Sequence, residues 1–168
     1  MGNDDTQPVA VSRRIAAPAG AIFEILADPG RHPAFDGSGM LQVGAANDIV
    51  SGVGDVFVMK MHNQRLGNYE MSNHVVEYEV NRSIVWEPAM RNAPEAGAAD
   101  VSIGTRPGHR WGFRLVPDGA DATIVTEIYD CSGAPDQLRA AVENGTVWVD
   151  SMTKSLERLD QLCAEKPT

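Results

Sequence analysis

The most regular pattern in the sequence is helical and covers residues 134–163. Apolar residues recur there every three, four or seven positions, at Leu138, Val142, Val149, Met152, Leu156, Leu159 and Cys163. This is the period of a helix with one buried face. Pro135 suits the first turn, where its missing N–H loses no hydrogen bond. Asn144 and Gly145 interrupt the pattern, and Thr146 offers a new N-cap, so we expect a kink or break at this point.

The beginning of the chain predicts one strand and two short helices. Residues 9–16 form the strand, and residues 19–27 form a helix that stops at Asp28-Pro29-Gly30. Residues 31–39 predict a second short turn or helix, because they end in the turn sequence Asp36-Gly37-Ser38-Gly39.

From residue 40 onward the apolar period changes to two. Strands are predicted over 40–43, 55–62, 68–80, 82–87, 109–116 and 122–130. In the third of these, Tyr69 and Met71 have one parity, whereas Val76, Tyr78 and Val80 have the other. One register cannot bury both sets, so we expect a β-bulge near Asn73. Residues 88–108, rich in Pro, Gly and Ala, predict a long loop.

This order predicts an α+β fold. Consecutive strands joined by turns form an antiparallel sheet with one apolar face, and the last helix has one apolar face as well. A twisted sheet that curls around the helix buries both faces and leaves a cavity where the two diverge. We expect residues 1–7 to be a disordered tail and residues 8–168 to be a single domain.

Several stretches carry a resemblance over about residues 9–163. They are Val11-Ser12-Arg13-Arg14-Ile15-Ala16-Ala17-Pro18, Ile22-Phe23, Leu26-Ala27-Asp28-Pro29, His32-Pro33, Phe35-Asp36-Gly37-Ser38-Gly39, Trp111-Gly112-Phe113-Arg114-Leu115-Val116-Pro117 and Thr123-Ile124-Val125-Thr126-Glu127-Ile128-Tyr129-Asp130. With them the chain resembles the START-like, or SRPBCC, superfamily, and most closely its bacterial polyketide cyclase/dehydrase and lipid-transport branch. The resemblance implies a helix-grip fold, a curved antiparallel sheet wrapped around a long C-terminal helix. It also implies hydrophobic ligands such as lipids, sterols or polyketides, which some members cyclise or dehydrate.

Charge and composition exclude several classes of partner. A formal net charge of −9 argues against nucleic acid and against an anionic membrane surface. No run reaches the ~18 apolar residues of a membrane span, and no signal-peptide pattern is present, so we expect a cytoplasmic protein. The histidines and the two cysteines lack metal-ligand spacing, and we expect no metal and no cofactor. The oligomeric state stays open.

The predicted cavity wall is apolar with a few polar anchors. Its candidate ligand-binding residues are Phe35, Phe57, Met59, Met61, Tyr78, Trp86, Trp111, Phe113, Val149, Met152 and Leu156. For each of them, ordinary core packing is the competing interpretation, because protein interiors are close-packed.

The candidate catalytic residues are Glu127, His74 and Tyr129. Glu127 shares a strand face with Val125 and Tyr129. If that face is concave, desolvation raises the pKa of Glu127 and makes it a usable acid or base. If Ile124 and Ile128 point inward instead, Glu127 faces solvent, and the pattern does not choose. By the resemblance, His32 and Asp36 lie at the pocket entrance, where they orient a ligand or only form a turn.

Three functions fit these features. The first is binding of a hydrophobic small molecule without chemistry, which we favour because no strong catalytic constellation is present. The second is a polyketide cyclase, aromatase or dehydratase that uses acid/base residues in the same cavity. The third is an interaction module that docks a partner through the groove or through residues 88–108.

Overall fold

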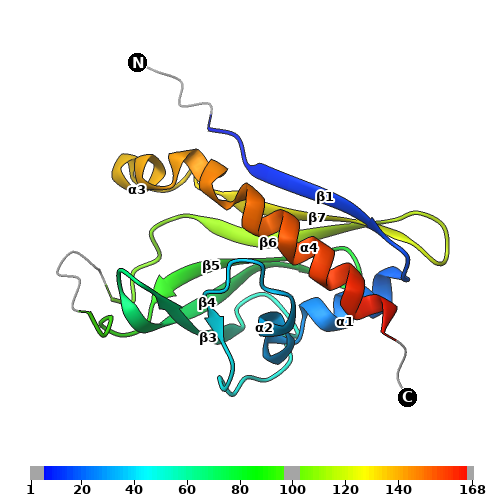
Figure 1. The fold of residues 1–168 in the computed structure, drawn as a ribbon, viewed down its shortest axis with the longest axis horizontal. Coiled ribbons are helices and arrows are strands. Elements are labelled where there is room, and N and C mark those ends of the chain that lie inside the picture. The colour runs from blue at the N-terminus through cyan, green and yellow to red at the C-terminus, as the bar shows by residue number, and fades with distance from the viewer. Residues whose placement is uncertain (1–5, 97–102, 166–168) are drawn as a thin grey trace.

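The computed structural model describes residues 6–96 and 103–165, and its main layer is a seven-stranded sheet that curls around one helix (Figure 1). The strand order is β1-β7-β6-β5-β4-β3-β2, and every neighbouring pair is antiparallel. The strands are β1 Val9–Ile15, β2 Leu41–Gln42, β3 Val56–Asn63, β4 Gly67–Glu79, β5 Ser83–Met90, β6 Arg110–Pro117 and β7 Thr123–Asp130. The expected antiparallel, curled sheet is confirmed.

Two short helices follow β1, as the sequence predicts. Helix α1 spans Ala19–Leu26, a 3-10 turn spans Pro29–Arg31, and α2 spans His32–Phe35. The turn between the helices forms because the Asp28 carboxylate accepts a hydrogen bond from the Gly30 N–H at 3.1 Å. These helices place His32 and Phe35 beside the concave face of the sheet.

The C-terminal helical region is broken, as expected. It consists of α3 Asp136–Ala141, a 3-10 segment Glu143–Trp148 and α4 Val149–Ala164. The break falls at Asn144 and Gly145, whose φ angles are 56° and 94°. The N-cap prediction for Thr146 is wrong: its hydroxyl donates to the Glu143 carbonyl at 2.8 Å, and α4 starts after Trp148.

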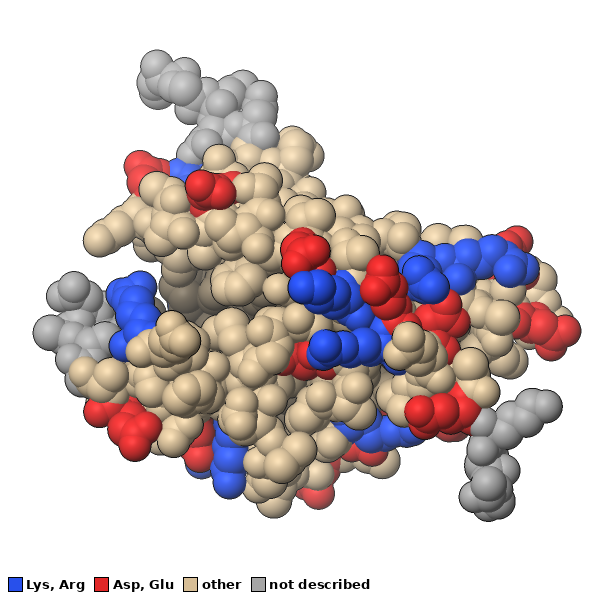
Figure 2. Space-filling model, viewed as in Figure 1, with Lys and Arg blue, Asp and Glu red and all other residues tan. Residues whose placement is uncertain are grey.

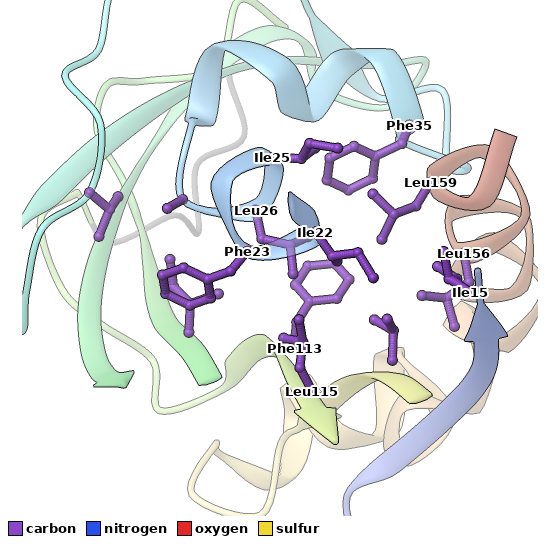
Figure 3. Packing of buried hydrophobic residues seen from close by; sticks show 14 of the residues in the cluster. Ile15, Ile22, Phe23, Ile25, Leu26, Phe35, Phe113, Leu115, Leu156 and Leu159 are labelled. Carbon is purple, nitrogen blue, oxygen red and sulfur yellow. The ribbon is translucent and has the colours of Figure 1, made fainter. Parts of the chain in front are cut away.

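The core lies between the helices α1, α2 and α4 and the inner face of the sheet (Figure 3). Ile15 of β1, Phe113 of β6 and Leu156 and Leu159 of α4 are each at most 3% exposed. Burying such a side chain contributes roughly 1.5–3 kcal/mol. This packing fixes α4 against one half of the sheet, and the other half diverges from the helix (Figure 1).

Two local predictions need correction. The expected bulge exists, but it lies between Val75 and Glu77 rather than near Asn73. The inward parity persists through Asn73 to Val75, which is 2% exposed, and only then does the ladder skip a residue. Strand β5 also continues to Met90, so the loop begins later than residue 88. Pro88 pairs with Asn73 of β4, but β6 pairs with β5 only as far as Trp86, so Pro88 lies at a local sheet edge, where proline is tolerated.

Parts of two other predictions lie outside the described residues: residues 1–5 of the expected tail and residues 97–102 of the expected loop. Among the helices that the structure describes, none has the length and apolarity needed to cross a membrane.

Candidate functional site

A cavity of about 220 Å³ lies where the sheet diverges from α4. Strands β3 to β7 form its floor, and α2, the segment after α2 and α4 form the other side. Figure 2 shows the molecular surface hollowed between the α3 end of the molecule and the edge that carries β3 to β5. A cavity of about 150 Å³ is large enough for benzene, so this one has room for a small organic molecule.

The cavity wall is mainly thioether and aromatic. Five methionines contribute to it: Met40, Met59, Met61, Met71 and Met152. All three tryptophans of the chain, Trp86, Trp111 and Trp148, line it as well, with Phe35 and Phe113. Methionine side chains are flexible and polarizable, and they adapt to ligands of irregular shape. The wall therefore suits an apolar molecule and does not demand one shape.

Glu127 is the charged residue in the floor of this cavity. It alternates with outward-facing neighbours on β7 and is 8% exposed. The parity that the sequence left open is thus settled, with Glu127, Val125 and Tyr129 inward. Burial, and to a smaller extent the nearby Asp36 carboxylate, raise the pKa of Glu127 to about 8. Within the described residues, its Oε2 atom is buried and has no hydrogen-bond partner.

A second polar cluster lies at the α3 end of the cavity. The hydroxyl of Tyr129 is 2.9 Å from Nδ1 of His109, and the Tyr129 ring packs 4.6 Å from that of Trp111. Burial lowers the pKa of His109 to about 4 and raises the pKa of the Tyr129 phenol. Nε1 of Trp148 is buried beside Tyr129 and makes no full hydrogen bond to any described residue. The indole N–H is therefore a second buried polar group without a well-formed hydrogen bond among the described residues.

His32 is the buried histidine of α2. Its Nε2 lies 2.8 Å from the Leu26 carbonyl oxygen, which only accepts, so Nε2 carries the proton. Its ring lies 5.7 Å from Trp86 and 5.8 Å from Phe57. Burial lowers the pKa of His32, so the ring is neutral and its Nδ1 holds a lone pair. His32 thus fixes α2 against the cavity without adding charge.

The segment after α2 is fastened over the cavity by short polar contacts. The Asp36 carboxylate accepts hydrogen bonds from the Ser38 hydroxyl at 2.7 Å and from the Leu41 N–H at 3.0 Å. The Gly37 N–H donates to the Ser155 hydroxyl of α4 at 2.8 Å. Arg158 of α4 donates to the Asp36 carbonyl. Asp36 is therefore part of this fastening, as well as a lining residue.

Most of the residues proposed from the sequence meet in the cavity. Glu127 and seven of the ligand-binding candidates line it: Phe35, Met59, Met61, Trp86, Trp111, Phe113 and Met152. Phe57 and Leu156 are 1% exposed and pack in the core, with Tyr78 against them, rather than on the cavity wall. Val149 is 39% exposed, because the break before α4 turns it outward.

The structure does not bring the three catalytic candidates together. Tyr129 lies behind the wall and reaches the cavity through His109. His74 is half-buried on β4 next to Asn73, which takes the inward position. The late bulge explains this: residues 69, 71, 73 and 75 keep one face inward, so His74 faces the other way.

Several lining residues were missed at the sequence level. Asn73 and Met71 share the parity of Tyr69, and His109 shares that of Trp111, so alternation already pointed to them. Ser151 and Ser155 flank Met152 on the side of α4 that lines the cavity, outside the set of apolar positions from which the buried face was predicted. Met40 precedes a strand of only two residues and gave no signal.

Metal ligation has no cluster to draw on within residues 6–96 and 103–165: no group of three or more His, Cys, Asp or Glu side chains is placed to hold an ion. The polar groups of the cavity wall are instead isolated carboxylate, imidazole, indole, amide and hydroxyl groups. Such groups suit hydrogen bonding to an organic ligand.

Comparison with solved structures identifies the class of fold. Protein Ms6760 from Mycobacterium smegmatis superposes with a TM-score of 0.65 at 15% identity, over 95% of this chain and 92% of that one. A norcoclaurine synthase point mutant from Thalictrum, in complex with a transition state analogue, superposes with a TM-score of 0.57 at 16% identity, over 94% of each chain. These likenesses show a helix-grip fold and confirm the fold class predicted from the sequence.

Sequence comparison finds relatives of this chain in Mycobacterium tuberculosis. Uncharacterized protein Rv0088 from Mycobacterium tuberculosis is 30% identical over 143 residues, which cover 84% of this chain and 54% of Rv0088. The chain therefore spans about half the length of this relative. No protein-family model matches the chain. DynU16, described as a putative protein in the dynemicin biosynthetic locus, is a further structural neighbour, with a TM-score of 0.56 at 19% identity over 94% of this chain and 47% of DynU16.

Proposed function

We propose that this protein binds a hydrophobic small molecule, lipid- or polyketide-like, in the cavity between the sheet and α4. The observation that carries the proposal is that two atoms in the wall of a mainly apolar cavity, Glu127 Oε2 and Trp148 Nε1, are buried without a well-formed hydrogen bond to any described residue. An unpaired buried polar group costs about 1–3 kcal/mol. A ligand that carries a matching donor and acceptor removes this cost.

Native mass spectrometry of protein purified without detergent tests the proposal. The expected result is an added mass on the folded protein that is lost when the protein is denatured and that appears as a small molecule in the organic extract. Protein that carries no added mass, and gains none when offered apolar compounds sized for a 220 Å³ cavity, contradicts it.

A second candidate is catalysis on a polyketide-like substrate, as in the cyclase/dehydrase branch that the sequence resembles. The favouring observation is the raised pKa of Glu127, about 8, which allows it to donate and accept a proton near neutral pH. Of the three catalytic candidates, however, Glu127 alone belongs to the described cavity wall. We therefore rank binding first. Catalysis predicts that Glu127→Gln binds substrate with unchanged affinity but loses turnover, whereas a simple binding protein shows no turnover in either form.

The net charge and the cysteine content bear on the partners and on the cellular location that we propose. The net charge of −9 disfavours nucleic-acid partners. Two cysteines are too few for a disulfide framework, and Cys163 forms no disulfide in the described structure; both features are typical of a reducing compartment and support a cytoplasmic location. Mass spectrometry of the protein alkylated directly from cells tests the location, because two reduced thiols are expected.

A further inference from the structure

The charge on the cavity wall has one sign. Among the described residues that line the cavity, the ionisable acids are Asp36 and Glu127, and no lysine or arginine is present. The two lining histidines add no positive charge near neutral pH, because burial lowers the pKa of both His32 and His109. An anionic headgroup that entered this cavity would lose its hydration and find no cation to replace it.

Glu127 is placed to act on a ligand rather than to support the fold. Its direct cross-strand neighbours are Phe113 on β6 and Val11 on β1, which offer no hydrogen bond. Its Oε2 atom is buried without a partner among the residues that the structure describes. A carboxylate that served only to hold the sheet together would have a partner from a neighbouring strand or helix.

We propose that the cavity selects ligands that carry a protonated amine on an apolar body, and that Glu127 is the specificity-determining residue that receives the ammonium group. This inference rests on the proposed binding function and names its ligand class. The ammonium N–H donates to Glu127 Oε2, and the apolar body lies against the methionines and aromatic rings. Trp111 and Phe113 belong to the same wall, and their ring faces attract a cation.

Binding of the amine is coupled to the release of a proton from Glu127. Burial raises the pKa of Glu127 to about 8, so at pH 7 most of the empty protein holds a proton on this carboxyl. The ligand amine, like a lysine side chain, is protonated below about pH 10. Forming the ion pair therefore releases one proton from Glu127 to solvent. The affinity for an amine then rises about tenfold per pH unit up to about pH 8 and levels off above it.

The other titratable groups in the cavity wall and directly behind it do not produce this pH dependence. From the adjoining elements, His32 and His109 have lowered pKa values, whereas Tyr129 and Tyr69 have raised ones. The side chains that α4 contributes to the wall, Ser151, Met152 and Ser155, carry no charge. Asp36 is held by hydrogen bonds from Ser38 and Leu41, and the guanidinium of Arg158 is held at the Asp36 carbonyl.

The test is calorimetric titration with three compounds that share one apolar body and differ in charge: phenylbutylamine, phenylbutanol and phenylbutyrate. Each is titrated into wild-type protein and into Glu127→Gln at pH 6, 7 and 8, in two buffers of different ionisation enthalpy. For the wild type at pH 8 we expect the amine to bind at least about tenfold more tightly than the alcohol, and the butyrate to bind most weakly. Amine binding should release close to one proton at pH 7.

Glu127→Gln is the matched variant because it keeps the size and polarity of the side chain and removes only its ability to ionise. It should lose both the preference for the amine over the alcohol and the pH dependence of amine binding. Equal or tighter binding of the alcohol or the butyrate by the wild type overturns the amine inference and leaves the proposed binding function in place. If no compound of the three binds folded wild-type protein, both proposals are overturned.

Discussion

The Gly37 N–H donates a hydrogen bond of 2.8 Å to the Ser155 hydroxyl and thereby joins the segment after α2 to α4 over the cavity. The approach is so close that a Cβ atom at position 37 would lie 2.2 Å from the Ser151 carbonyl oxygen and 2.6 Å from the Ser155 nitrogen. Both obstacles are backbone atoms of α4, which cannot turn aside as a side chain can. Glycine is thus required at position 37 by contact with α4.

Gly37→Ala should lower the free energy of unfolding by about 1–3 kcal/mol, because the segment must move away from α4 and gives up its hydrogen bond. Urea denaturation measures this change. Gly52→Ala is the matched control, since a Cβ at Gly52 meets nothing within 4 Å. Equal stability losses in the two variants would show that position 37 is not tightly packed.

Glu127 should make the folded protein less stable as the pH rises. Its pKa is raised from 4.5 to about 8, so between these values the folded chain holds a proton that the unfolded chain has released. The free energy of unfolding therefore falls by about 1.4 kcal/mol per pH unit across this window because of this group. Glu127→Gln should remove that slope in urea denaturation between about pH 5 and 8, whereas Glu157→Gln on the exposed face of α4 should not. Parallel curves for wild type and Glu127→Gln would contradict burial of this carboxyl.

His109 should have the opposite dependence. Burial lowers its pKa from 6.5 to about 4, so its contribution to stability is complete above about pH 6.5 and is lost as the pH falls through 4. In NMR spectra the ring of His109 should keep the shifts of neutral imidazole down to about pH 5. A midpoint near 6.5 would mean that the ring is solvated.

Tyr129→Phe removes the hydroxyl that lies 2.9 Å from Nδ1 of His109, and it should lower the free energy of unfolding by about 1 kcal/mol.

A large side chain that extends from α4 into the cavity should weaken ligand binding. Ser151 lines the cavity and is only half-buried, so phenylalanine at this position extends into the empty space. Ser151→Phe should weaken binding of phenylbutanol at least about tenfold, whereas Glu157→Phe, on the exposed face of the same helix, should leave it unchanged. Isothermal titration calorimetry measures both. Unaltered binding by Ser151→Phe would place the ligand elsewhere.

The fold was predictable because its elements carry strong periodic signals. Residues 109–116 and 122–130 alternate with a period of two, and the residues after Gly145 follow the helical period. The two strands and the helix that these patterns predict are present. The bulge was misplaced because the parity change in β4 shows only that a residue is skipped, and the skipped position depends on packing around Val75. Pro88 suggested a loop, but its neighbour in the ladder, Asn73, accommodates it.

The site was predictable only in part, for a different reason. Alternation tells which residues share a face but not which face is concave, and β7 has apolar residues on both. Pairing with β1 and β6 decides the matter and turns Glu127 inward. Periodicity also cannot separate residues that fill the core, such as Phe57 and Leu156, from those that face a void, such as Met59 and Met152. That distinction depends on how far the sheet diverges from α4.

The most direct test of the cavity as the binding site uses the three tryptophans, since all of them line it. In a two-dimensional ¹⁵N–¹H NMR spectrum their indole N–H groups give three resolved signals. On addition of phenylbutanol, we predict that all three signals shift. The largest change should be at Trp148, whose Nε1 makes no well-formed hydrogen bond in the described structure. Saturating ligand that leaves the three indole signals in place while backbone signals elsewhere move would contradict the account.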